Sequence, residues 1–357
     1  MSIVTSSPDA STQAPLLRVT GLRTLFPLAG GREAAAVDDV SFEIARGETL
    51  GLVGESGSGK SVTALSIIRL VMPPGRIAAG RIELEGRNLM ELGEEDMRRV
   101  RGRRIGFVFQ EPMVALNPVY TIGFQIRETL QVHNLARGAA ADRRAIELLE
   151  AVRVPDPQRR AKEYPHQLSG GLRQRAMIAL SLAADPALLI ADEPTTALDV
   201  TVQAEVLDLL RELRRTFGLS LLLITHDLGV VAEMADRVAV MYCGRIVEHA
   251  TVADIFRAPA HPYTRGLLAS IPGGRSGDAL TAIPGVVPPL GQTGPGCAFA
   301  PRCADRFAPC DAAPPMLTTL EPGHDVRCYL HQEAGSSRLE ARSSRLEAGS
   351  SDPARRS

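Results

Sequence analysis

The sequence has little net charge and lacks long apolar runs. Forty Lys and Arg residues face 41 Asp and Glu residues in a chain of 357, for a formal charge of −1. This balance argues against nucleic acid as a partner. No apolar run approaches the ~20 residues that span a bilayer; residues 221–224, among the longest, are strand-sized. The polar, Pro-containing start lacks the basic and apolar regions of a secretory signal. We therefore expect a cytosolic protein that reaches any membrane through a partner.

Cysteine is also scarce, but four of the five cysteines lie within 32 residues; these are Cys297, Cys303, Cys310 and Cys328. In a reducing compartment such a group is more typical of metal ligands than of disulfides. The spacing C-x5-C-x6-C-x17-C lacks the close pair of most structural zinc sites. Four thiolates suit a [4Fe–4S] cluster, which would help a segment with few large apolar residues to fold. Four alternatives stay open: His324 as a ligand, zinc, unligated thiols or two disulfides.

Glycine is concentrated in the stretch GESGSGKS, which fits the pattern G-x-x-x-x-G-K-[ST]. A strand pattern at residues 49–53 precedes it, and helical spacing at residues 60–71 follows. Successive backbone N–H groups of such a loop surround phosphate oxygens at a helix N-terminus. We expect Lys60 to reach the β- and γ-phosphates of ATP and Ser61 to ligate Mg²⁺. The predicted ATP-binding loop comprises Gly54, Glu55, Ser56, Gly57, Ser58, Gly59, Lys60 and Ser61.

Two carboxylates end the apolar stretch LLIADEP. Asp192 is expected to hold Mg²⁺ through water, and Glu193 to orient and deprotonate the attacking water, because phosphoryl transfer depends on positioning and charge neutralisation. Gln110 follows a strand pattern at residues 105–109, where its amide can touch both metal and water. His226 ends another strand pattern and is expected to hydrogen-bond the γ-phosphate. The predicted catalytic residues are thus Glu193, His226 and Gln110, and the predicted Mg²⁺ residues Ser61, Gln110 and Asp192.

A second phosphate cradle is predicted at Ser169, Gly170 and Gly171, which open a helical pattern running to about residue 184. With the motifs FQEP, TALD and ITHD in fixed order, the chain resembles the ATP-binding-cassette ATPases over about residues 16–255. That resemblance implies that this cradle faces the nucleotide of a second subunit, with Asp199 at the seam. It also implies that Phe26 stacks on adenine, the alternative being a core Phe.

Four sequence stretches are similar to those of the ATPases of dipeptide/oligopeptide importers. They are the signature LSGGLRQR, with Leu172 in the usual Gln position, EPMVALNP, HPYT and the string of four cysteines. The resemblance implies ATP hydrolysis that powers peptide import. It also implies a similar sister cassette, two membrane permease subunits docking near Gln110, and an extracytoplasmic peptide-binding protein. The site of action would be the cytoplasmic face of the cell membrane. Nickel, glutathione and oligosaccharide importers belong to the same subfamily and remain alternatives.

A non-transport ATPase of the superfamily is the other alternative. A DNA-repair ATPase would carry a long coiled coil between the P-loop and the LSGG motif, where this chain has 107 residues between Lys60 and Leu168. A translation factor would carry two cassettes in one chain, and this sequence contains one set of motifs.

Strand patterns alternate with helical patterns, which predicts an α/β fold with a largely parallel sheet. We expect a RecA-like P-loop ATPase core with a helical insertion at about residues 112–184, plus a small C-terminal cysteine-containing module. The expected domains are a disordered start (1–14), a cassette (15–258), an importer extension with a four-Cys metal site (259–332) and a low-complexity tail (333–357). The tail contains the near-repeat SSRLEA twice.

Overall fold

The computed structural model describes residues 14–196, 198–271 and 283–332. The chain divides into two compact units. The first takes the described residues up to 24 together with 39–50 and 61–224, and the second takes 25–38, 51–60 and the described residues from 225 onwards. None of the helices in these ranges combines the length and the apolar character that crossing a bilayer requires. The predicted disordered start and repeat tail lie outside the described residues, apart from residue 14 at the end of that start.

A parallel sheet forms the centre of the first unit. Its strands are β6 (Ile105–Val108), β7 (Leu188–Asp192) and β8 (Ser220–Thr225). β7 pairs in parallel with both neighbours, so that Leu188 lies opposite Ile105 on one side and Ser220 on the other. Every residue of β7 is buried, as expected for a strand covered on both faces. The carboxyl ends of these strands meet at one edge, and this places Asp192 there.

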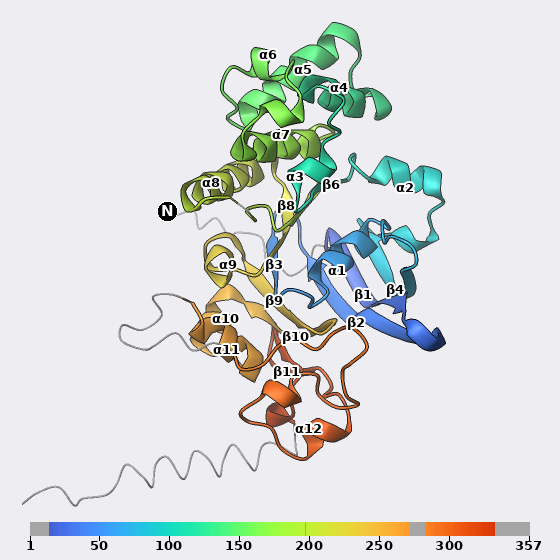
Figure 1. The fold of residues 1–357 in the computed structure, drawn as a ribbon, viewed down its shortest axis with the longest axis vertical. Helices are drawn as coiled ribbons and strands as arrows, with labels where there is room; N and C mark the ends of the chain where they lie inside the picture. The colour runs from blue at the N-terminus through green and yellow to red at the C-terminus, as the bar shows by residue number, and fades with distance from the viewer. Residues whose placement is uncertain (1–13, 197, 272–282, 333–357) are drawn as a thin grey trace, which may run out of the picture. The chain divides into compact units, whose positions relative to one another are not determined.

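The helical insertion predicted at residues 112–184 is helical in the structure. It contains α3 (Pro112–Ala115), α4 (Ile122–Val132), α5 (Gly138–Ala151), α6 (Pro157–Arg160) and α7 (Gly170–Leu182). α4, α5 and α6 lie together on one side of α7 (Figure 1), and α4 and α5 both pack on α7. α8 (Val200–Phe217) follows β7 and buries an apolar stripe that includes Val206, Leu210 and Leu213. α8 ends at Gly218, which adopts the left-handed conformation.

A smaller sheet has the strand order β2-β1-β4-β5. Its strands are β1 (Leu17–Pro27), β2 (Glu33–Ile44), β4 (Arg76–Leu84) and β5 (Arg87–Asn88). Burial alternates along β1, where Leu17, Val19 and Leu22 face the core. β3 (Thr49–Val53), α1 (Lys60–Ile67) and α2 (Glu94–Val100) complete the elements up to residue 104.

The second unit is built on antiparallel strands. β9 (Arg237–Tyr242) pairs with β10 (Arg245–Thr251), which pairs with β12 (His324–Val326) and through it with β11 (Thr318–Glu321). The helices are α9 (Leu228–Met234), α10 (Val252–Arg257), α11 (Pro262–Ala269) and α12 (Pro309–Ala312). The hairpin of β11 and β12 is absent from the sequence expectations, although Pro322 and Gly323 between two strand-like stretches are a turn signal.

The C-terminal segment, residues 283–332, packs against a core supplied by other elements. Phe299 packs with Tyr242 of β9 and Tyr263 of α11, with ring centroids 5.3 Å apart in both pairs. Val326 and Leu330 form a second buried cluster with Ala260. The segment has few large apolar residues, as the sequence indicated, but it shares a core with β9, β10 and α11.

A buried histidine makes the stability of the second unit depend on pH. His249 Nε2 lies 2.9 Å from the Arg237 guanidinium. Burial, and then the charge of Arg237, lower the pKa of His249 from 6.5 to about 4. Between these values the unfolded chain binds a proton that the native chain excludes, so the free energy of unfolding should fall as pH falls. The expected slope is on the order of 1 kcal/mol per pH unit.

His249→Gln should therefore reduce the pH dependence of stability. A Gln amide oxygen can still accept a hydrogen bond from Arg237, but the side chain does not titrate. Urea unfolding at pH 7 and pH 5 should show a smaller loss of stability in the variant, by about 1–2 kcal/mol. An unchanged loss between the two pH values would show that His249 is not the group responsible.

Candidate nucleotide site

The glycine loop connects β3 to α1 and is held against neighbouring backbone. A Cβ on Gly54 would lie 2.2 Å from the carbonyl oxygen of Met241, and one on Gly59 would lie 2.4 Å from that of Ala36. Both glycines have positive φ, 157° and 105°. Lys60 Nζ donates to the carbonyl oxygens of Gly54 at 2.8 Å and Glu55 at 3.1 Å. The loop is thus a compact backbone cradle with its lysine folded over it.

Ser61 and Asp192 come together in the first unit. Ser61 Oγ donates to Asp192 Oδ1 at 3.1 Å, although 131 residues separate them in sequence. Ser61 belongs to the first turn of α1 and Asp192 is the last residue of β7. A hydroxyl beside a carboxylate at a sheet edge suits Mg²⁺ held by the serine directly and by the aspartate through water.

Glu193 lies directly after β7 in a left-handed backbone conformation, with φ of 46°. This region is uncommon for a residue other than glycine, and such strain often occurs at active sites. Glu193 Oε2 accepts hydrogen bonds from Gln110 Nε2 at 3.3 Å and from Thr196 Oγ1 at 2.8 Å. Two of the predicted catalytic residues are therefore in contact. Thr196, part of the TALD motif, is a partner that the sequence reasoning did not identify.

The predicted second cradle is the exposed start of α7. Ser169 caps this helix, with Oγ 3.4 Å from the backbone nitrogen of Leu172. Ser169 and Gly170 are exposed and Gly171 is half-buried. Asp199 is also exposed and caps α8, accepting from the backbone nitrogen of Val202 at 3.0 Å. Both helix starts are thus exposed, each capped by its own side chain.

His226 and Phe26 belong to the second unit. His226 follows Thr225 at the end of β8 and is exposed. The next residue, Asp227, caps α9 by accepting from the backbone nitrogens of Gly229 and Val230. Phe26 lies near the end of β1 and is half-buried, so it is not a fully buried core residue.

The four clustered cysteines line one small cavity, together with Phe299, Phe307 and Leu330 among others. All are free thiols, so the disulfide alternative is not found. Burial raises the pKa of Cys303 to about 11 and that of Cys328 to about 12. His324, considered as a substitute ligand, instead lies 2.9 Å from the buried carboxylate of Glu248.

The predicted four-Cys metal site is not preformed. Within residues 14–196, 198–271 and 283–332, no group of three or more His, Cys, Asp or Glu side chains has an arrangement that could hold a metal ion. The [4Fe–4S] expectation therefore has the right residues in one place without the geometry of a ligand set.

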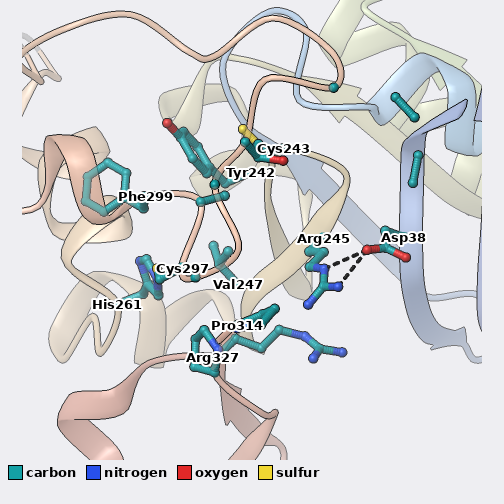
Figure 2. Close-up of a pocket in the computed structure, with 18 of the residues that line it drawn as sticks. Asp38, Tyr242, Cys243, Arg245, Val247, His261, Cys297, Phe299, Pro314 and Arg327 are labelled. Carbon is teal, nitrogen blue, oxygen red and sulfur yellow. Dashed lines mark hydrogen bonds and ion pairs between the residues drawn. The ribbon is translucent and has the colours of Figure 1, made fainter. Parts of the chain in front are cut away.

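A larger cavity of about 310 Å³ adjoins the C-terminal segment (Figure 2). Tyr242, Cys243 and Val247 line it from β9, β10 and their turn, and Cys297 and Phe299 from the C-terminal segment. Arg245 in its wall donates to Asp38 Oδ2 at 2.6 and 3.0 Å. Cys297 and Phe299 line both cavities, so the larger cavity is next to the small cavity of the four cysteines.

Comparisons with known proteins identify the family. The ABC transporter family model matches residues 37–196, and the model of the oligopeptide/dipeptide transporter C-terminal region matches residues 247–310. The solved structure of the ATP-binding cassette MJ0796, a dimer in a post-hydrolysis state with ADP and Pi, has a TM-score of 0.59 and 28% identity. The match covers 66% of this chain and 98% of the MJ0796 chain. The fold is that of an ATP-binding cassette with a RecA-like P-loop core.

Curated relatives are closer in sequence. A Brucella melitensis protein named as a peptide import ATP-binding protein is 53% identical over 335 residues, which cover 90% of this chain and 99% of the relative. The oligopeptide transport ATP-binding protein AppD of Bacillus subtilis is 52% identical over 326 residues, again 90% of this chain and 99% of the relative. The chain belongs to the ABC transporter family and is one of its ATPases.

Glu193→Gln should keep nucleotide binding and stop turnover. The amide preserves the shape and the contacts with Gln110 and Thr196 but cannot take a proton from water. We expect phosphate release to fall by about 100-fold or more while equilibrium ATP binding is retained. Lys60→Ala is the contrasting variant and should weaken binding itself, because it removes the charge that reaches the phosphates. Turnover at the wild-type rate in Glu193→Gln would remove Glu193 from this role.

Proposed function

We propose that the protein hydrolyses ATP to power import of dipeptides and oligopeptides through partner membrane subunits. The observation that carries the proposal is the match to the oligopeptide/dipeptide transporter C-terminal region on the same chain as an intact Ser61–Asp192 and Gln110–Glu193 pair. Relatives with more than 50% identity named for peptide import support the solute class.

The residues divide the chemistry among them. The backbone of the glycine loop and Lys60 bind the phosphates. Ser61 and Asp192 would hold Mg²⁺, which would supply charge neutralisation for the phosphates. Glu193 Oε2 accepts hydrogen bonds from both Gln110 and Thr196. Release of Gln110 toward the phosphates exposes the Glu193 carboxylate to a water molecule. Glu193 then orients this water and takes its proton, and His226 donates a hydrogen bond to the γ-phosphate.

A second cassette, a sister of this chain, completes the site. The start of α7 at Ser169 and the start of α8 at Asp199 are exposed, and the dipole of α7 favours an anion at its start. The dimeric state of the similar cassette MJ0796 supports this arrangement. In it, Ser169, Gly170 and Gly171 contact the nucleotide bound to the partner's P-loop, and Asp199 lies at the seam.

The permease subunits dock on the first unit. A groove of about 320 Å³ there is lined by Leu70, Phe107 and Phe109 among others. Nearby in sequence, Val114 and Val119 are 80% and 68% exposed. We assign this surface to a permease segment with an apolar face. The protein would then act at the cytoplasmic face of the membrane, with an extracytoplasmic peptide-binding protein supplying the solute.

A matched pair of variants tests the function in the assembled transporter. A Cβ on Gly170 would lie 3.8 Å from Leu198 Cδ2, an ordinary contact distance. Gly170→Asp should therefore fold and place a negative charge where the partner's phosphates bind. Gly93→Asp is the control, because Gly93 is an exposed helix cap with open space around it. In proteoliposomes, Gly170→Asp should abolish ATP-driven uptake of a labelled dipeptide, and Gly93→Asp should not.

Two outcomes would contradict the proposal. Uptake of nickel, glutathione or an oligosaccharide in place of peptides would change the solute. Normal dipeptide uptake by the Gly170→Asp variant would show that the exposed start of α7 does not serve the partner's nucleotide. ATP binding to the variant's own P-loop should stay normal in either case.

We also propose that Cys297, Cys303, Cys310 and Cys328 bind a [4Fe–4S] cluster with a structural role. The support is that all four thiols line one cavity whose other walls are largely apolar. Because they are not already arranged as ligands, binding must release their protons and draw the sulfur atoms together. The match to the importer C-terminal region reaches residue 310 and so includes three of the four.

Anaerobic purification should give a brown protein with about four irons per chain. Cys303→Ser should lose the colour and most of the iron. Cys243→Ser should keep both, because Cys243 does not line the small cavity with the four clustered cysteines. Iron content and visible absorbance are the measurements. Stoichiometric zinc without visible absorbance would contradict the cluster and leave the ATPase assignment intact.

A further inference from the structure

Glu55, the second residue of the glycine loop, is held from three directions within the second unit. Its carboxylate accepts from Arg302 at 2.7 and 3.0 Å. Its backbone nitrogen donates to the hydroxyl of Tyr263 at 2.9 Å. Its carbonyl oxygen accepts from Lys60 Nζ at 3.1 Å. One residue of the phosphate loop is therefore connected to its lysine on one side and to the C-terminal segment on the other.

Arg302 occupies a rigid position. It ends the 3-10 turn Ala300–Arg302, one residue before Cys303, and its side chain is 4% exposed against 30% for Glu55. Arg302 Nε donates to the carbonyl oxygen of Pro284 at 2.8 Å. The guanidinium carbon lies 5.8 Å from the ring centroid of Tyr242 and 5.9 Å from that of Phe299. A planar guanidinium group held in this way can hydrogen-bond both oxygens of a carboxylate at once and so fix the orientation of that carboxylate.

Tyr263 is equally constrained. Its ring is buried in an aromatic cluster, with centroids 4.7 Å from Tyr242 and 5.3 Å from Phe299. It belongs to the HPYT stretch at residues 261–264, whose His261 caps α11 by accepting from the backbone nitrogen of Tyr263. The local cap orients the start of the helix, and the hydroxyl of Tyr263 then reaches the backbone of the phosphate loop.

We propose that Arg302 and Tyr263 are positioning residues of the ATP site, which hold Glu55 and through it set the phosphate loop and Lys60. The C-terminal segment thereby contributes to nucleotide affinity without touching the nucleotide. The physical basis is preorganisation. A loop already fixed in the binding conformation loses less conformational freedom when phosphate binds. The proposal depends on ATP binding alone and not on the transported solute or on a bound cluster.

Arg302→Gln should weaken ATP binding by about tenfold, corresponding to one lost charge-assisted interaction. ADP should be affected as much as ATP, because both carry the β-phosphate that Lys60 contacts, while AMP should be affected little. In turnover assays the KM for ATP should rise and kcat should change much less. Arg302→Lys should fall between wild type and Arg302→Gln, since lysine keeps the charge but cannot bond both oxygens at once.

Tyr263→Phe provides the milder test. It removes a single hydroxyl from a buried ring and leaves the aromatic cluster intact, so it should fold even if Arg302→Gln does not. It leaves the Glu55 N–H without this partner, and we expect a loss of about threefold to tenfold in ATP and ADP affinity. Arg306→Gln is the control, because Arg306 belongs to the same segment but pairs with Asp311 on the exposed surface.

A double-mutant cycle shows whether Arg302 acts through Glu55. If it does, Glu55→Ala with Arg302→Gln should bind ATP no more weakly than the worse single variant. Equilibrium titration of the full chain is the measurement, with urea unfolding and metal content recorded for each variant. The proposal is overturned if folded Tyr263→Phe and Arg302→Gln bind ATP as wild type does. It is also overturned if AMP affinity falls equally, or if the effects of Glu55→Ala and Arg302→Gln add.

Discussion

Close packing of the glycine loop against neighbouring backbone is the constraint on which the nucleotide site depends. The carbonyl oxygens of Met241 and Ala36 leave no room for a Cβ at Gly54 or Gly59. Lys60 then folds back over the loop onto two of its carbonyl oxygens. Any substitution that moves β9 or β2 away from the loop, or adds a side chain to Gly54 or Gly59, would move the backbone N–H groups that bind phosphate. The loop sequence and the backbone around it therefore function as one part.

The remaining polar groups in the first unit are positioned by strand ends and helix caps. Asp192 ends the buried strand β7 and Glu193 follows it, so that both carboxylates reach the same sheet edge. Gln110 and Thr196 both donate hydrogen bonds to the Glu193 carboxylate and so orient it at that edge. Ser169 and Asp199 cap their own helices, whose starts are exposed.

Sequence patterns predicted the elements around the ATP site closely, because each is short and carries its own signal. The strand expected at residues 49–53 is β3, and the helix expected from Ser169 is α7. The apolar strand expected to end at the two acidic residues is β7, whose last residue is Asp192. Prediction was poorer after residue 259. The hairpin of β11 and β12 was missed, and the cysteines predicted as a ligand set line one cavity without forming one. Their packing depends on partners far away in the sequence.

The sequence by itself determined the family, the phosphate loop, the paired carboxylates and the identity of the clustered cysteines. Each of these depends on residue type at a fixed local spacing, which a chain carries before it folds. Only the tertiary structure decided that Glu55 is held by Arg302, 247 residues away, and by Tyr263, 208 residues away. An ion pair between distant residues has no periodicity or spacing to reveal it. It exists because β9, α11 and the C-terminal segment share an aromatic core that brings these side chains to one loop.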